Sequence, residues 1–126
     1  MNRVLIVNDR PTFRLQLRQL LKRAGMAVVG AAGDIPEAEA QVRALRPDLA
    51  VVDVMLPGIS GLKGVPRLRA LAPGLRVILV SAHHDQASIF RDAAARAAAE
   101  AFVQKDDLDL DVVRTWPVRR ERESPA

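Results

Sequence analysis

Cysteine is absent from this 126-residue chain, and aromatic residues make up only 3% of it. Without cysteine, neither a disulfide nor a thiolate metal site can form. The scarcity of aromatic side chains argues against a base-stacking platform for nucleic acid. No apolar run approaches the roughly 20 residues that a membrane-spanning helix needs. The short apolar run at residues 4–7 stops at once at polar residues, unlike a signal peptide. We therefore expect a cytoplasmic location and no membrane contact.

A strong charge of one sign is also missing. The net charge is +4, but residues 1–113 hold 15 basic and 13 acidic residues, a net of +2, so half of the excess lies in residues 114–126. The length predicts a single domain, which we place at residues 1–116. Residues 117–126 are charged and carry two prolines, which predicts a disordered tail. This tail is too short for a helix-turn-helix, so we expect no direct binding to nucleic acid.

The most informative stretch begins at Leu49, where an unbroken apolar run carries one carboxylate, Asp53, and leads into a turn at Pro57-Gly58. Such a run is typical of a strand that is buried on both faces of a parallel sheet. Asp53 would lie near the carboxyl end of that strand, the edge at which open α/β sheets bind ligands. A carboxylate buried there needs cations or hydrogen-bond donors.

The remaining chain alternates between strand and helix patterns, which predicts a parallel sheet covered on both faces. Pro66 should kink the third helix or delay its start. Beside the run at Leu49, strands are expected at 3–7, 26–32, 76–80 and 101–104, and helices at 11–24, 35–45, 61–72, 85–99 and from about 108 to 116.

Polar residues stand where the predicted strands end, and in a parallel sheet these ends lie on one edge. They are Asn8, Asp9, Asp53, Ser81 and Lys105. Two close carboxylates favour a hard divalent cation such as Mg²⁺, which binds through one or two carboxylates plus a phosphate. An aspartate can also act as a nucleophile towards phosphorus and form an aspartyl-phosphate. Mg²⁺ and Lys105 would then supply positive charge, and the Ser81 hydroxyl could donate to a phosphoryl oxygen.

Four segments of the chain together resemble the receiver domain of two-component response regulators. They are Val-Leu-Ile-Val-Asn-Asp (4–9), Asp-Val-Met-Leu-Pro-Gly-Ile-Ser-Gly (53–61), Val-Ile-Leu-Val-Ser-Ala-His (77–83) and Ala-Phe-Val-Gln-Lys-Asp (101–106). The resemblance covers about residues 3–113. It implies a (βα)5, doubly wound, five-stranded parallel sheet of the flavodoxin-like kind, acting as a phosphorylation-dependent switch.

The resemblance also implies roles at the phosphorylation site. Asp53 would accept a phosphoryl group from a sensor histidine kinase or a phosphotransfer protein. Asp9, Asp53 and the backbone carbonyl of Met55 would bind Mg²⁺, and Lys105 would pair with the phosphoryl group. Asn8 departs from the family, which usually has an acidic residue there, and would reach the metal through a water molecule. The protein would be no turnover enzyme, although slow self-dephosphorylation is expected.

Further positions are implied to transmit the signal. Ser81 and Phe102 match the switch hydroxyl and the switch aromatic residue, and His83 lies near the site, where it would tune hydrolysis of the aspartyl-phosphate. The output surface would be residues 85–116, used by a downstream protein partner or by a second copy in a homodimer. At Ala98 the family usually has a glycine, so the end of that helix is expected to be remodelled.

Several alternatives remain open at this point. Asp53 could be satisfied by backbone N–H groups alone, Asp9 could cap the first helix, Lys105 could be solvated, and Phe102 could be a core residue without a switching role. Asn8, Pro66 and the altered fourth helix motivate a rival function, a degenerate receiver that binds partners without responding to phosphate. A small flavodoxin-like ligand-binding protein is a weaker rival, because the loops lack a glycine-rich phosphate cradle.

Overall fold

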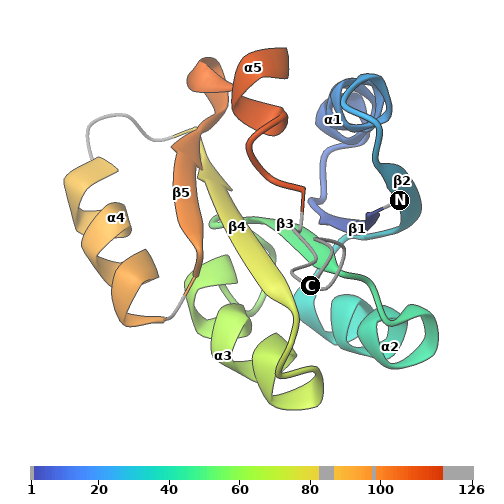
Figure 1. The fold of residues 1–126 in the computed structure, drawn as a ribbon. Helices are drawn as coiled ribbons and strands as arrows, with labels where there is room; N and C mark the ends of the chain where they lie inside the picture. The colour runs from blue at the N-terminus through green and yellow to red at the C-terminus, as the bar shows by residue number, and fades with distance from the viewer. Residues whose placement is uncertain (1, 83–86, 98, 118–126) are drawn as a thin grey trace, which may run out of the picture.

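The computed structural model describes residues 2–82, 87–97 and 99–117, and within them five strands form one parallel sheet (Figure 1). The strands are β1 (Arg3–Val7), β2 (Ala27–Ala32), β3 (Leu49–Asp53), β4 (Arg76–Ser81) and β5 (Ala101–Gln104). Their order across the sheet is β2-β1-β3-β4-β5, and every neighbouring pair is parallel. The order reverses between β1 and β3, so a crevice at the carboxyl ends of these two strands is the expected ligand site.

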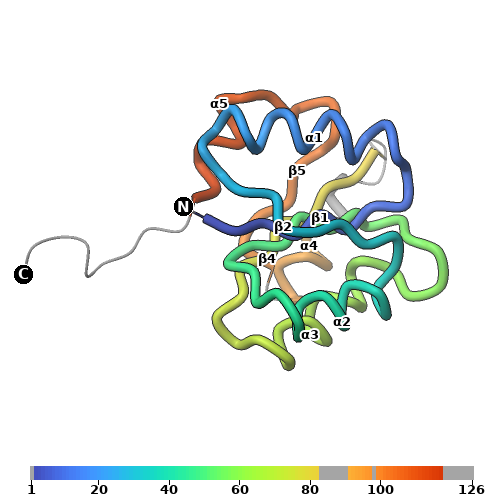
Figure 2. The backbone as a smooth tube through the Cα atoms, turned by 90° about the vertical axis from the view of Figure 1, so that its right-hand side faces the viewer, coloured from blue at the N-terminus to red at the C-terminus, as the bar shows by residue number. Residues whose placement is uncertain are grey.

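Helices cover both faces of the sheet. They are α1 (Pro11–Arg23), α2 (Ile35–Leu45), α3 (Gly61–Leu71), α4 (Ala87–Arg96) and α5 (Leu110–Val113). Figure 2 shows α1 and α5 on one side of the strands and α2, α3 and α4 on the other. None of the described helices combines the length and the apolar character needed to cross a bilayer.

The alternation of side chains along β1 divides the core between the two faces. Leu5 and Val7 join the cluster beneath α2 and α3, whereas Val4 and Ile6 join the cluster beneath α1 and α5. Successive strand residues point to opposite faces, so an uninterrupted apolar run is needed where both faces are covered. The wholly buried β3 fits this requirement, and the predicted doubly wound parallel sheet is confirmed.

Side-chain caps fix where three of the helices begin. The carboxylate of Asp34 accepts from the backbone N–H of Glu37, the hydroxyl of Ser60 accepts from Lys63, and the carboxylate of Asp109 accepts from Val112. Each cap satisfies a backbone donor that the first helical turn leaves without a partner. By contrast, α1 begins after Arg10, which provides no side-chain cap. The alternative in which Asp9 caps this helix is therefore wrong.

Some element bounds differ from the prediction. The start of α3 is not delayed by Pro66, because the Ser60 cap sets it at Gly61 and the helix continues past the proline to Leu71. The last helix is shorter than predicted, because a 3-10 turn (Lys105–Asp107) follows β5 and the Asp109 cap delays α5 to Leu110. The predictions for His83, for Ala98 and for the tail at 118–126 lie outside the described residues.

The loop after β3 folds back tightly against that strand. Gly58 has a positive φ of 80°, which suits glycine in the turn. The backbone N–H of Gly61 then donates to the carbonyl of Val54 at 2.8 Å. A β-carbon added at Gly61 would lie 2.1 Å from the backbone carbonyl oxygen of Asp53. Only glycine therefore lets α3 begin this close to the residue that ends β3.

Substituting Gly61→Ala should destabilise the fold by roughly 1–3 kcal/mol, because the backbone of Asp53 has to move to admit the methyl group. Urea unfolding of both variants would measure the change against Gly74→Ala, where an added β-carbon meets nothing within 4 Å. Equal stability of the two variants would show that the contact between Gly61 and Asp53 is not a constraint.

Candidate phosphoacceptor site

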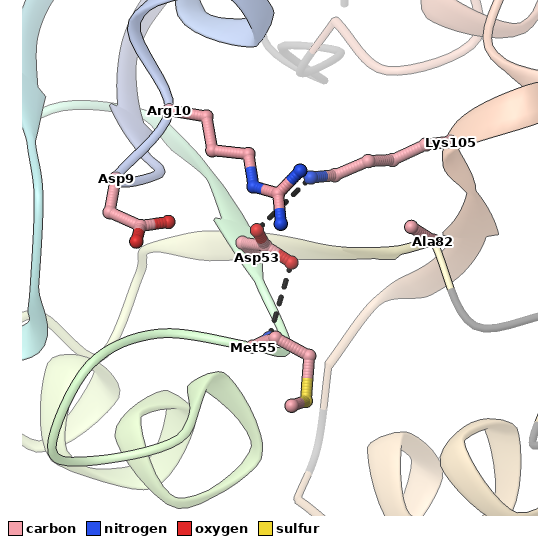
Figure 3. A pocket seen from close by; sticks show the side chains of 6 residues that line it. All are labelled: Asp9, Arg10, Asp53, Met55, Ala82 and Lys105. Atoms are coloured by element: carbon pink, nitrogen blue, oxygen red, sulfur yellow. Dashed lines mark hydrogen bonds and ion pairs between the residues drawn. The ribbon is translucent and has the colours of Figure 1, made fainter.

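The structure places the five predicted polar residues at the carboxyl-end edge of the sheet, and three of them, Asp9, Asp53 and Lys105, line one cavity. Asn8 and Asp9 follow β1, Asp53 is the last residue of β3, Ser81 is the last residue of β4, and Lys105 directly follows β5. Figure 3 shows Asp9, Asp53 and Lys105 around one cavity. Residues that are far apart in sequence meet here because parallel strands place all their carboxyl ends together.

Asp53 is a buried carboxylate, with only 3% of its surface exposed. One oxygen, Oδ2, accepts from Nζ of Lys105 at 3.1 Å and from Nδ2 of Asn8 at 3.0 Å. The other oxygen, Oδ1, accepts from the backbone N–H of Met55 at 3.2 Å. An ionised carboxylate is stable in such a place only when it is paired and hydrogen-bonded. The alternative in which backbone groups alone satisfy Asp53 is therefore wrong.

Asn8 uses both ends of its buried side-chain amide. While Nδ2 donates to Asp53, Oδ1 accepts from the backbone N–H of Arg10 at 2.8 Å. An aspartate at this position would lack the donor and would repel Asp53. The Asn8 amide thus links the backbone at Arg10, between β1 and α1, to the carboxylate at the end of β3. The role predicted for Asn8 towards a metal-bound water stays a prediction.

Lys105 reaches Asp53 along the ring of Phe13. Its Nζ lies 4.3 Å from the ring centroid, and its side chain is only 14% exposed. A cation over an aromatic face is stabilised by the negative charge of the π system. Lys105 is therefore held between α1 and the carboxylate, which contradicts the alternative of a solvated lysine. The sequence does not reveal this contact, because Phe13 is there simply one apolar residue of a helical stripe.

A cavity of about 80 Å³ opens in front of Asp53. Figure 3 shows the side chains around it: Asp9, Arg10, Asp53, Met55, Ala82 and Lys105. Arg10 was not predicted as a site residue, although its position directly after Asn8 and Asp9 was a signal that could have identified it. The cavity is lined by the carboxylates of Asp9 and Asp53 and by the cationic side chains of Arg10 and Lys105. Two cations beside a carboxylate are suited to binding an anion next to it.

Ser81 and Phe102 lie on the same face of the sheet. Ser81 is fully buried, and its register partner on β5 is Gln104, two residues after Phe102. Phe102 is partly buried and packs against the cluster beneath α2 and α3, which also includes Ala94 of α4. The guanidinium carbon of Arg91, from α4, lies 5.5 Å from the Phe102 ring centroid. This placement suits a core residue and a switch residue equally, so the switching role stays a prediction.

The donors present fit a hard divalent cation. The carboxylates of Asp9 and Asp53 line the cavity together with Met55, whose backbone carbonyl would be a third oxygen ligand. Among the described residues, no group of three or more His, Cys, Asp or Glu side chains could enclose a metal ion. The residues therefore suit an open site, where water and phosphate oxygens would complete the coordination.

Comparison with known proteins identifies the family. The family model of the response regulator receiver domain matches residues 4–113. The chain belongs to this family, whose members are in general signalling modules of two-component systems that work with histidine kinases and typically bind a divalent metal at the phosphorylated aspartate.

Individual relatives agree with this assignment. The chain is 31% identical to the chemotaxis protein CheY of Thermotoga maritima over 82% of this chain and 84% of that protein. It is 36% identical to a putative transcriptional regulator of Pseudomonas aeruginosa over 83% of this chain, but it spans only 50% of that regulator. Among solved structures, the signal receiver domain of the putative response regulator NarL from Mycobacterium tuberculosis is 30% identical, with a TM-score of 0.81 and 90% of each chain covered.

Substituting Asn8→Asp should lower the free energy of unfolding by about 1–3 kcal/mol in EDTA, because it removes a buried hydrogen bond and adds a repelling carboxylate. Saturating Mg²⁺ should restore much of this loss, because a divalent cation neutralises the repulsion. Urea unfolding with and without Mg²⁺ measures both effects.

Gln19→Glu makes the same chemical change at an exposed position of α1 and serves as the control. Equal losses for the two variants, or a loss for Asn8→Asp that Mg²⁺ leaves unchanged, would contradict the role given to the Asn8 amide.

Proposed function

We propose that this chain is a phosphorylation-dependent switch in which Asp53 accepts a phosphoryl group from a histidine of a sensor kinase or phosphotransfer protein. The observation that carries the proposal is the buried Asp53 carboxylate, fixed by Lys105 and Asn8 at the floor of a cavity. Membership of the receiver family supports it, and the family's phosphate chemistry requires little of a protein beyond positioning and neutralising charge.

The reaction follows from the chemistry of the groups. A carboxylate oxygen of Asp53 attacks phosphorus, and a new O–P bond forms as the P–N bond to the donor histidine breaks. The electron pair stays on the imidazole nitrogen, which takes a proton from water. The ammonium of Lys105, 3.1 Å from Oδ2, stabilises charge on the phosphoryl oxygens. Bound Mg²⁺, held by Asp9, Asp53 and the Met55 carbonyl, would add positive charge at the same oxygens.

Slow self-dephosphorylation reverses the switch. Water attacks the phosphorus of the aspartyl-phosphate, inorganic phosphate leaves, and the Asp53 carboxylate is restored. Met55, which is 53% exposed at the mouth of the cavity, would influence how easily water reaches the phosphorus. The same influence of His83 stays a prediction from the sequence.

The output is a shift between two conformations. A phosphoryl group favours the active state only by binding it more tightly than the inactive state. Ser81, at the end of β4, would turn towards the phosphoryl group, and Phe102 would move inward on the same face of the sheet. The surface formed by α4, β5 and α5 would then bind a protein partner or a second copy.

Several relatives are named as transcriptional regulators, and this chain spans about half the length of the Pseudomonas one. The absence of direct nucleic-acid binding and the cytoplasmic location remain predictions.

Incubation with acetyl phosphate, followed by intact-mass spectrometry, tests the chemistry. With Mg²⁺ the protein should gain one phosphoryl group, and Asp53→Asn should gain none because an amide is not a nucleophile towards phosphorus. Asp111→Asn makes the same substitution at a side chain that is 93% exposed and should gain the group normally.

A folded wild-type protein that gains no phosphoryl group at any Mg²⁺ concentration would overturn the proposal. That result would favour the phosphate-independent interaction module, to which the neutral Asn8 already points.

A further inference from the structure

Arg10 is a cation at the phosphoacceptor site that the proposed chemistry does not use. It follows Asn8 and Asp9 directly, and its backbone N–H donates to Oδ1 of Asn8 at 2.8 Å. Its side chain lines the cavity with Asp53 and Lys105, and Figure 3 shows the guanidinium pointing towards Asp53, on the same side as the Lys105 ammonium. Asn8 therefore fixes both the carboxylate and the backbone from which Arg10 extends.

Among the described residues, the guanidinium of Arg10 has no ion-pair partner. In the described part of the chain, the side chain that pairs with Asp53 is Lys105, and no ion pair or hydrogen bond engages the Arg10 guanidinium. Guanidinium groups bind phosphate oxygens through two parallel hydrogen bonds, a geometry that an ammonium does not offer. Arg10 is thus placed and available to bind an oxyanion above Asp53.

The charges around the cavity differ from those of a site built for a cation alone. Among its described lining residues, Asp9 and Asp53 contribute two negative charges, and Arg10 and Lys105 contribute two positive charges. Asn8 adds none. A cavity with no net charge attracts a divalent cation less strongly than an acidic one and repels a phosphoryl group less strongly.

We propose that Arg10 is a second cationic ligand of the phosphoryl group at Asp53, beside Lys105, and that it takes over part of the charge neutralisation otherwise supplied by Mg²⁺. The inference rests on the proposed function. It has a consequence that a merely solvated arginine would not have, since removal of Arg10 should affect a cation and an oxyanion in opposite directions.

The test compares Arg10→Gln with the wild-type protein in two measurements. Titration of Mg²⁺, followed by the backbone amide NMR signals of Asp9 and Met55, should show about tenfold tighter binding in the variant, because one repelling charge is gone. Phosphorylation by acetyl phosphate at Mg²⁺ concentrations that saturate both proteins, followed by intact mass, should become about tenfold slower in the variant, because one phosphate ligand is gone.

Arg18→Gln is the matched control. It removes the same charge from an exposed position of α1 that does not line the cavity, so both measurements should match the wild type. Either an unchanged Mg²⁺ affinity or an unchanged phosphorylation rate for Arg10→Gln would overturn the inference, as would equal effects of the two variants.

Failure of the proposed function would be recognised separately. If the folded wild-type protein gains no phosphoryl group at any Mg²⁺ concentration, the switch function is wrong and Arg10 cannot be a ligand of the phosphoryl group. If Asp53 is phosphorylated but Arg10→Gln leaves either measurement unchanged, only the inference about Arg10 is wrong.

Discussion

The ion pair between Lys105 and Asp53 joins the end of β5 to the end of β3, across the intervening β4. A carboxylate that is 3% exposed has lost nearly all of its hydration, so its partners must replace the water. Lys105 supplies the charge, Asn8 supplies an amide donor, and Met55 supplies a backbone N–H. Phe13 holds the ammonium from the side of α1. Residues that follow β1, β3 and β5 therefore converge on one buried charge.

The same constraint would connect stability to the proposed signalling. The groups that satisfy Asp53 in the unmodified protein are also those that would meet a phosphoryl group. Phosphorylation of this carboxylate would therefore redistribute hydrogen bonds that join three strand ends. Ser81 lies at the next strand end, and Phe102 lies on the same face of the sheet. A small change at the cavity could thereby reach the α4-β5-α5 surface by way of β4 and β5. The balance of charge at the cavity, with Arg10 and Lys105 facing Asp9 and Asp53, would set how much a metal ion contributes.

The parts of the fold that depend on one regular feature could be predicted from the sequence. Apolar runs ending in polar residues are sufficient to place Asp53 and Lys105 at one edge, because parallel strands align their carboxyl ends. The sequence does not reveal features that depend on the direction of a side chain or on a local helix cap. Figure 3 shows the guanidinium of Arg10 pointing towards Asp53, and the Asn8 side chain accepts from the Arg10 backbone N–H, a contact that no periodicity reveals. The delayed start of α5 depends on the cap at Asp109, and the undelayed start of α3 depends on Ser60 rather than on Pro66.

The central claim is that the carboxylate of Asp53 itself carries the phosphoryl group. Borohydride reduces an acyl phosphate to an alcohol, so reduction of the phosphorylated protein, followed by peptide sequencing in a mass spectrometer, identifies the modified side chain. The account predicts homoserine in place of aspartate at position 53, with Asp9 unchanged. Homoserine at position 9, or a phosphorylated protein that yields no homoserine at all, would contradict it.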